Sequence, residues 1–209
     1  MLNVRNIILA TVAAILLWIG VPNFLAAIWM ATSAPTYKDI GSGKPVATTE
    51  IEAAIESRKR AIALTNSARA MTDLGVAYVT LDPSPENIEK AVVSLRSGIE
   101  LSPMNAFAWQ RLAGLAVYLP GNEAEALTAW RTARQLAEYD TFLLHDRIRV
   151  GTLLYRVMEP ADREALLQDT ERAYRMNRGA LRTFARQANL LEWLKFILRD
   201  EEKTKFLTP

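Results

Sequence analysis

Cysteine is absent from this chain of 209 residues, and histidine occurs only once, at His145. Without a thiol the chain can form no disulfide, zinc–thiolate site or iron–sulfur cluster, and it has no cysteine nucleophile. A single imidazole likewise excludes metal sites that need two or three histidines. We therefore expect no metal and no cofactor.

A strong net charge is also lacking, since 25 Lys and Arg face 23 Asp and Glu, for a formal net charge of +2. Such a balance produces no strong field toward a nucleic acid. His145 and Asp146 are neighbours that point in different directions on a helix, and the serines from Ser84 to Ser102 lack a nucleophile-elbow context. We expect neither a nucleic-acid partner nor enzymatic activity.

Charged residues are missing altogether between Ile7 and Ala31. As a helix rising about 1.5 Å per residue, this stretch covers roughly 37 Å, enough to cross a hydrocarbon core of about 30 Å. Pro22 predicts a kink inside it, and Trp29 suits the aromatic belt at the membrane surface. Residues 1–32 are therefore predicted to form a short tail and a single transmembrane helix, with residues 7–31 in the membrane.

A cleaved signal peptide is the alternative interpretation of this segment, because Arg5 precedes an apolar stretch from Ile7 to Val21. Apolar residues continue past Pro22, however, and the small-residue cleavage candidate is followed by Pro35, so an uncleaved anchor is favoured. The charges on the two flanks are nearly tied. The short N-terminal tail and long C-terminal domain then favour an extracytoplasmic, periplasmic domain.

Residues 33–48 contain Pro35, Gly41, Gly43 and Pro45 among small polar residues, and we predict a linker there. The sequence Gly41-Ser42-Gly43-Lys44 resembles the end of a phosphate-binding P-loop. The motif requires Gly at position 38 and Ser or Thr at position 45, where this chain has Lys and Pro. We therefore expect no nucleotide site.

An all-α domain is predicted for residues 49–199, followed by a tail at 200–209. Thr49 and Glu52 form a capping-box pattern, which predicts the start of a helix. Later helices are separated by turn signals, and no segment alternates in the manner of a strand. The turn signals are Asp82 to Pro85, Ser102-Pro103, Pro120 to Asn122, Tyr139-Asp140, Glu159-Pro160 and Asn177 to Gly179.

Small and large residues recur with a fixed period in this part of the chain. The small residues would let paired helices approach closely, and the large ones would fill the gaps between them. The first unit has Leu74-Gly75-x-x-Tyr78, then Ala91-x-x-x-Leu95-x-x-Gly98 and Pro103; the second has Trp109-x-x-Leu112-Ala113, then Ala126-x-x-x-Trp130-x-x-Ala133.

These two units resemble the tetratricopeptide (TPR) repeat, and Trp109 follows Pro103 at the spacing that contiguous repeats require. A third unit, at residues 140–178, agrees less well. A last helix at residues 180–198 would cap the array, with Arg199 on its polar face. The resemblance implies a short TPR-like α-solenoid of helical hairpins, in which Trp109 and Trp130 are core residues.

The resemblance also implies a concave groove, lined by the first helix of each repeat, that binds a protein partner. Burial of Phe107 and Phe142 against a neighbouring repeat is the alternative, and His145 is equally consistent with an ordinary helix position. The implied partner-binding residues are Arg69, Thr72, Val76, Phe107, Gln110, Gly114, Phe142, His145 and Arg149.

A cluster of arginines near the end of the repeat region is a second candidate site. Guanidinium groups bind phosphate and carboxylate groups well, so an anionic glycan, a lipid headgroup or an acidic partner could dock there. The alternative is a solvated face paired with Asp169 and Glu171. The members are Arg172, Arg175, Arg178, Arg182 and Arg186.

The sequence thus favours a non-catalytic, membrane-anchored scaffold that recruits a protein partner to a membrane assembly. The segments Leu101–Ala113 and Glu171–Asn177 are similar to small TPR proteins of bacterial envelope polysaccharide assembly, which implies a role in that process. An anionic-ligand module and an accessory subunit of an energy-transducing membrane complex are the two alternatives.

Overall fold

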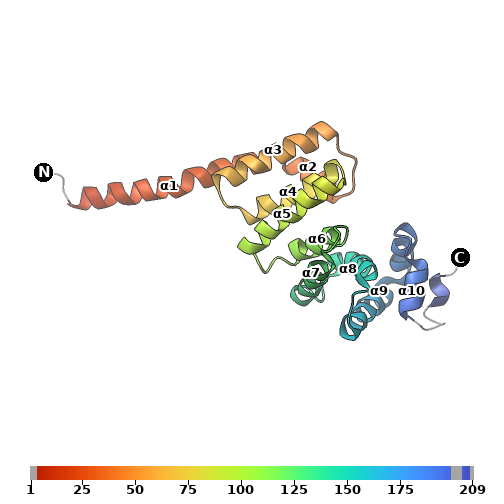
Figure 1. Cartoon of the computed structure of the whole chain (residues 1–209). Coiled ribbons are helices and arrows are strands. Elements are labelled where there is room, and N and C mark those ends of the chain that lie inside the picture. The colour runs from red at the N-terminus through yellow and green to blue at the C-terminus, as the bar shows by residue number, and fades with distance from the viewer. Residues whose placement is uncertain (1–3, 199–203, 208–209) are drawn as a thin grey trace. The chain divides into compact units, whose positions relative to one another are not determined.

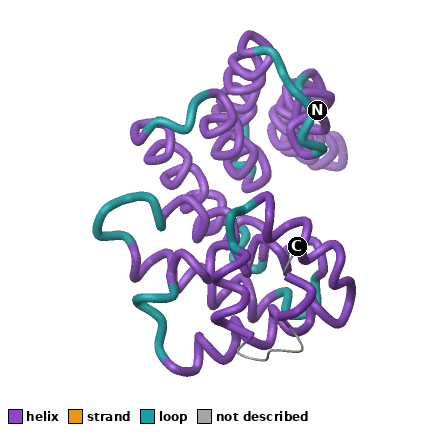
Figure 2. The backbone as a smooth tube through the Cα atoms, turned by 90° about the vertical axis from the view of Figure 1, so that its right-hand side faces the viewer, coloured by secondary structure: helices purple, strands orange, loops and turns teal. Residues whose placement is uncertain are grey.

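The computed structural model describes residues 4–198 and 204–207, and within these ranges every regular element is helical (Figure 2). The all-α prediction is confirmed. The chain divides into two compact units, Met1–Pro103 and Met104–Pro209, in place of the single repeat domain predicted for residues 49–199. Unit 1 includes the apolar N-terminal helix, because the end of that helix packs against the helix at residues 48–64.

Unit 1 begins with a helix that is long and apolar enough to cross a membrane, and this helix runs unbroken through Pro22, where a kink was predicted. Its polar side chains are satisfied locally: Thr11 and Asn23 donate to the carbonyls of Ile7 and Ile19, one turn earlier. The helices of unit 1 are α1 (Val4–Thr32), α2 (Ala34–Gly41), α3 (Thr48–Leu64), α4 (Ala68–Leu81) and α5 (Pro85–Leu101) (Figure 1).

The stretch at residues 33–48, predicted as a linker, contains the short helix α2. Pro35 stands in the first turn of α2, where a missing backbone N–H is tolerated, and Gly43 follows the helix with a positive φ of 70°. Pro35 and Gly43 thus mark the start and the end of this helix. The predicted capping box is also absent from the described structure, since α3 begins at Thr48 without a side-chain cap.

Helices α4 and α5 form a hairpin in which two glycines permit a close approach. A Cβ atom on Gly75 would lie 3.0 Å from the carbonyl oxygen of Ala91, and one on Gly98 would lie 2.9 Å from the hydroxyl of Thr72. The small residues of the repeat pattern thus lie at helix crossings, as their spacing predicts.

Unit 2 continues with paired helices, and its turns fall where the sequence signals predict them. Asp140 accepts hydrogen bonds from the backbone N–H groups of Phe142 and Leu143 at the start of α8. Asn177 breaks α9 with non-helical backbone angles. The helices are α6 (Ala106–Ala116), α7 (Glu123–Leu136), α8 (Thr141–Leu154), α9 (Pro160–Gln187) and α10 (Leu191–Leu198), followed by the 3₁₀ turn η1 (Lys205–Leu207).

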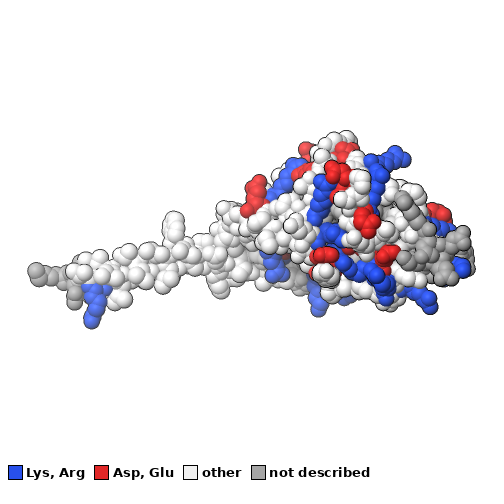
Figure 3. Space-filling view, turned by 90° about the horizontal axis from the view of Figure 1, so that it is seen from below, with Lys and Arg blue, Asp and Glu red and all other residues white. Residues whose placement is uncertain are grey.

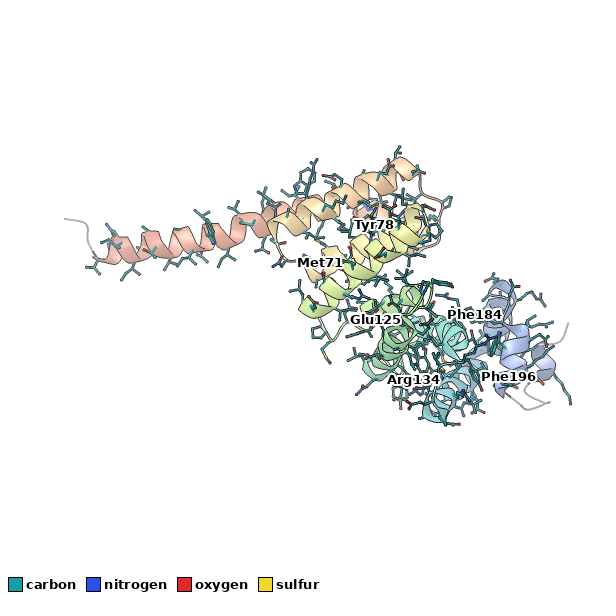
Figure 4. All side chains as sticks on the ribbon, in the orientation of Figure 1. Met71, Tyr78, Glu125, Arg134, Phe184 and Phe196 are labelled. Atoms are coloured by element: carbon teal, nitrogen blue, oxygen red, sulfur yellow. The ribbon has the colours of Figure 1, made fainter. Side chains whose placement is uncertain are left out.

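The capping helix predicted at 180–198 is divided in two. Asn189 takes a left-handed φ of 55°, which ends α9 and lets α10 start at Leu191. In α10, Trp193 and Phe196 (the latter labelled in Figure 4) pack around the ring of Tyr155. The predicted tail is partly structured, because η1 contacts α9 and buries Leu207; residues 199–203 and 208–209, including Arg199, lie outside the described residues.

A buried ion pair connects α8 to α9. The guanidinium of Arg147 lies 2.9 Å from the carboxylate of Asp169, and both side chains are fully buried. Arg147 also donates to the carbonyls of Ala137 and Glu138, which end α7. Arg134 of α7 (labelled in Figure 4) lies 3.4 Å from the same carboxylate. One arginine therefore links the end of α7 with α8 and α9.

Trp130 lies in the core beside this ion pair, whereas the side chain of Trp109 is less buried. Trp130 is almost fully buried and donates its indole N–H to the carbonyl of Arg147 at 2.9 Å. Trp109 is only half-buried, which corrects the prediction that both tryptophans are core residues.

Replacing Trp130 with Ala should lower the free energy of unfolding by about 3–5 kcal/mol, because it creates a large cavity and removes the hydrogen bond to the carbonyl of Arg147. Trp109→Ala should cost clearly less, since its ring is partly solvated. Urea unfolding of the full chain in detergent, followed by circular dichroism, measures both. Equal losses in the two variants would contradict this packing.

Candidate partner-binding face

The three candidate residues in unit 1 do not form a continuous surface. Thr72 is buried, and its hydroxyl donates to the carbonyl of Ala68 at 2.9 Å. Val76 is half-buried. Arg69 alone is well exposed, with its guanidinium 3.9 Å from the carboxylate of Asp73. Thr72 was wrongly predicted to line a groove, because its helix turns it toward α5.

In unit 2, α6 and α8 contact each other and bring the remaining six candidates together. Gln110 donates to the carboxylate of Asp146 at 2.9 Å, and Arg149 approaches the other oxygen of that carboxylate at 2.6 Å. Gly114 lies beneath Arg149, whose guanidinium would be 3.5 Å from a Cβ atom placed there. We call this surface, formed by Phe107, Gln110, Gly114, Phe142, His145 and Arg149, the α6–α8 face.

Gln110 and Gly114 are buried, so they form the floor of the face and offer little contact area, contrary to the prediction. The two phenylalanines are exposed instead, Phe107 by 43% and Phe142 by 87%. Because α6 and α8 pair in parallel, with residue 110 beside 146 and 114 beside 150, Phe107 and Phe142 lie at the same level. Within unit 2, neither ring is buried against a neighbouring helix.

Polar interactions hold the floor in place. Burial disfavours the charge of Arg149, but the carboxylate of Asp146 and the hydroxyl of Tyr118 outweigh it, so that the pKa of Arg149 lies above its ordinary value. Sequence reasoning missed Asp146 and Tyr118. Only their helical spacing relative to Gln110 and Arg149 could have indicated them, and that signal is shared by many surface residues.

His145 packs against α9 and does not face open solvent. Its imidazole stacks on the ring of Phe184 with the ring centres 4.8 Å apart (Figure 4 labels Phe184). Partial burial disfavours the imidazolium ion and lowers the pKa of His145 below its ordinary value. The residue thus contributes to the packing of the face as a neutral ring.

The arginine cluster is divided by the break at Asn177. Arg172 already has partners within the fold. It forms a salt bridge with Glu138, lies 3.5 Å from Asp169, and stacks its guanidinium on the ring of Tyr139. This bears out the alternative of pairing with Asp169 for Arg172. Beyond the break, a depression is lined by Gly179, Arg182, Thr183, Arg186 and Gln187. Arg175, before the break, and Arg178, after it, are exposed.

Comparison with known proteins adds no family to these observations. No model of a known protein family matches the sequence, and no curated protein matches it. The function is therefore argued from the two units and the α6–α8 face themselves.

The single histidine makes its environment directly measurable. In an NMR titration of the full chain in detergent, we expect the pKa of His145 below about 6.5 in the folded protein and near that value in urea. Because the folded pKa is depressed, the stabilisation is fully present above about pH 6.5 and is lost as the pH falls through the folded pKa.

Phe184→Ala, which exposes the imidazole, should return the pKa of His145 toward the ordinary value. A folded pKa at or above the value found in urea would contradict the packing of His145 on Phe184.

Proposed function

We propose that the protein is a single-pass, membrane-anchored scaffold of the TPR type, without catalytic activity, that recruits a protein partner to a membrane assembly. Its helical units would stand on the extracytoplasmic, periplasmic side. The similarity of Leu101–Ala113 and Glu171–Asn177 to proteins of bacterial envelope polysaccharide assembly favours a membrane complex of that process.

The anchor is supported by the surface of α1. On the face that Figure 3 shows, its side chains form a cylinder that is uncharged except for basic atoms near the N-terminal end, whereas acidic and basic groups intermingle on the surface beyond it. Trp18 is 83% exposed on this cylinder. An isolated helix with this surface would be covered by lipid rather than by water.

The α6–α8 face is the observation that carries the proposed partner binding. Two exposed phenylalanines stand at one level above a floor of paired polar groups, Gln110, Asp146 and Arg149. Exposed aromatic rings with adjacent oriented polar groups are typical of the residues that dominate binding energy at protein interfaces. A partner that buries these rings would gain apolar area while the floor stays hydrogen-bonded.

The combined variant Phe107→Ala/Phe142→Ala should therefore lose its partner. Each truncated anchor ring is worth about 1–2 kcal/mol or more at such an interface, so recovery of the partner should fall at least about tenfold. Affinity purification of the full chain from its membranes in mild detergent, with quantitative identification of the proteins that co-purify, measures this loss.

A matched control is Leu153→Ala/Val157→Ala, which removes similarly exposed apolar side chains elsewhere in unit 2. It should retain the partner, and both variants should keep the circular dichroism of the parent. If the phenylalanine variant keeps all its partners, the α6–α8 face is not the binding surface. Contact through α1 would then be favoured, as in an accessory subunit of an energy-transducing complex.

Binding of an anionic glycan or lipid is the second candidate function, favoured by the depression that Gly179, Arg182 and Arg186 line. The variant Arg178→Glu/Arg186→Glu should abolish binding to vesicles containing phosphatidylglycerol if this site operates. That binding should also weaken steeply with salt, because exposed charges are screened over about 10 Å at 0.1 M. Co-sedimentation with full-length protein in nanodiscs tests both expectations, and unchanged binding would exclude the site.

A further inference from the structure

The last third of α1 is part of the core of unit 1. Ala26 is buried together with Ala61 of α3 and Ala70 of α4, and Trp29 and Met30 pack against the same cluster. The apolar stretch that resembles one long membrane span therefore has two environments. The side chains up to Val21 are all exposed in the described structure, whereas later ones pack against α3.

Hydrogen bonds fix the register of this packing. The hydroxyl of Ser57 donates to the carbonyl of Trp29, and the guanidinium of Arg58 donates to the carbonyl of Met30 at 3.0 Å. Farther back along α1, the end of α3 and the α3–α4 turn, Leu64 to Asn66, share a depression with the α1 residues from Trp18 to Asn23. The two helices are thus antiparallel, and α3 reaches back as far as Trp18.

This register carries charged groups alongside α1. Arg58 and Arg60 lie level with Trp29 and Met30, and the guanidinium of Arg60 covers the indole ring of Trp29 at 4.4 Å. Glu56 pairs with Arg60 at 3.2 Å on the exposed side. Such side chains are strongly disfavoured in hydrocarbon. If residues 7–31 all lay in the bilayer, these charged groups would lie at the edge of the hydrocarbon, and the polar side chains of Thr65 and Asn66 in the α3–α4 turn would lie well inside it, level with Trp18 to Asn23.

Resting on the proposed membrane anchorage, we infer that α1 crosses the hydrocarbon with residues 4–21 only, and that the α3–α4 turn sits on the bilayer surface beside Trp18 and Pro22, against lipid headgroups. Residues 4–21 rise about 27 Å, close to the roughly 30 Å of a hydrocarbon core. Arg5 extends to one interface, and the exposed ring of Trp18 lies at the other. No charged side chain lies between Ala61 and Ala68, so the turn fits this level.

Unit 1 is consequently seated directly on the membrane, because no flexible segment separates it from the span. The depression between α1 and the turn has a volume of about 520 Å³ and is lined by uncharged residues, among them Asn23 and Asn66. Their amide groups can hydrogen-bond to lipid headgroups.

Cysteine accessibility tests the inference, because the chain has no cysteine of its own. The test uses three single variants of the full chain in phospholipid nanodiscs. They are Leu16→Cys in the proposed span, Ile28→Cys in the last third of α1, and Val93→Cys on α5. Their native side chains are 65%, 45% and 53% exposed in the structure. Nanodiscs make both membrane faces accessible, so the result does not depend on orientation.

With a membrane-impermeant maleimide, Ile28→Cys should react at a rate similar to Val93→Cys. Leu16→Cys should react at least about tenfold more slowly, because a thiol in hydrocarbon cannot form the reactive thiolate. Protection of both Leu16→Cys and Ile28→Cys would overturn the short span while leaving the anchor intact. Fast reaction of all three would overturn the anchor itself.

Fluorescence quenching tests the position of the α3–α4 turn separately. Bimane attached to Leu64→Cys should be quenched by phosphatidylcholine brominated near the headgroup end of its acyl chains, whereas bimane on Val93→Cys should not. Equal, weak quenching at both sites would overturn the seating of the turn. Circular dichroism and thermal unfolding matched to the parent chain exclude misfolding as the cause.

Discussion

The guanidinium group of Arg58 is the interaction on which unit 1 depends. Although buried, it pairs with Asp73 of α4 at 3.1 Å, donates to the carbonyl of Met30 and the hydroxyl of Ser33, and covers the ring of Tyr37 at 4.2 Å. A buried charge is tolerated only when its donors are satisfied in this way. The end of α1, the start of α2, and α3 and α4 are therefore held by one side chain. Burial also raises the pKa of the Tyr37 hydroxyl well above its ordinary value, so this ring stays neutral.

Unit 2 uses the same device at a different place. Arg147 satisfies a buried carboxylate, Asp169, and caps the carbonyls that end α7. In each unit, a buried arginine donates hydrogen bonds to backbone carbonyls at the end of a helix and also contacts the helices that pack against that end. Apolar side chains alone would leave these carbonyls without a partner. On the surface of unit 2, the exposed rings of Phe107 and Phe142 offer apolar area for binding.

The proposed anchoring and recruitment would rest on these two arrangements. Arg58, at the base of α1, connects the apolar helix to the core of unit 1. The α6–α8 face belongs to unit 2, whose core contains Asp169 and Trp130. The proposed scaffold would need one unit fixed to the membrane and another that presents a surface, and the division of the chain at Pro103 provides two such units.

The sequence by itself determined the helical class and most helix ends, because caps and breakers act within about three residues of the backbone groups they satisfy. Asp140, Pro160 and Asn177 are examples. It also determined that residues 7–31 carry no charge and that small residues recur at helix crossings. Only the tertiary structure decided that Thr72 and Gln110 are buried, that Arg172 pairs with Glu138, and that the end of α1 belongs to unit 1. Those outcomes depend on helix rotation and on partners 15 to 36 positions apart, and no local period encodes such distant pairings.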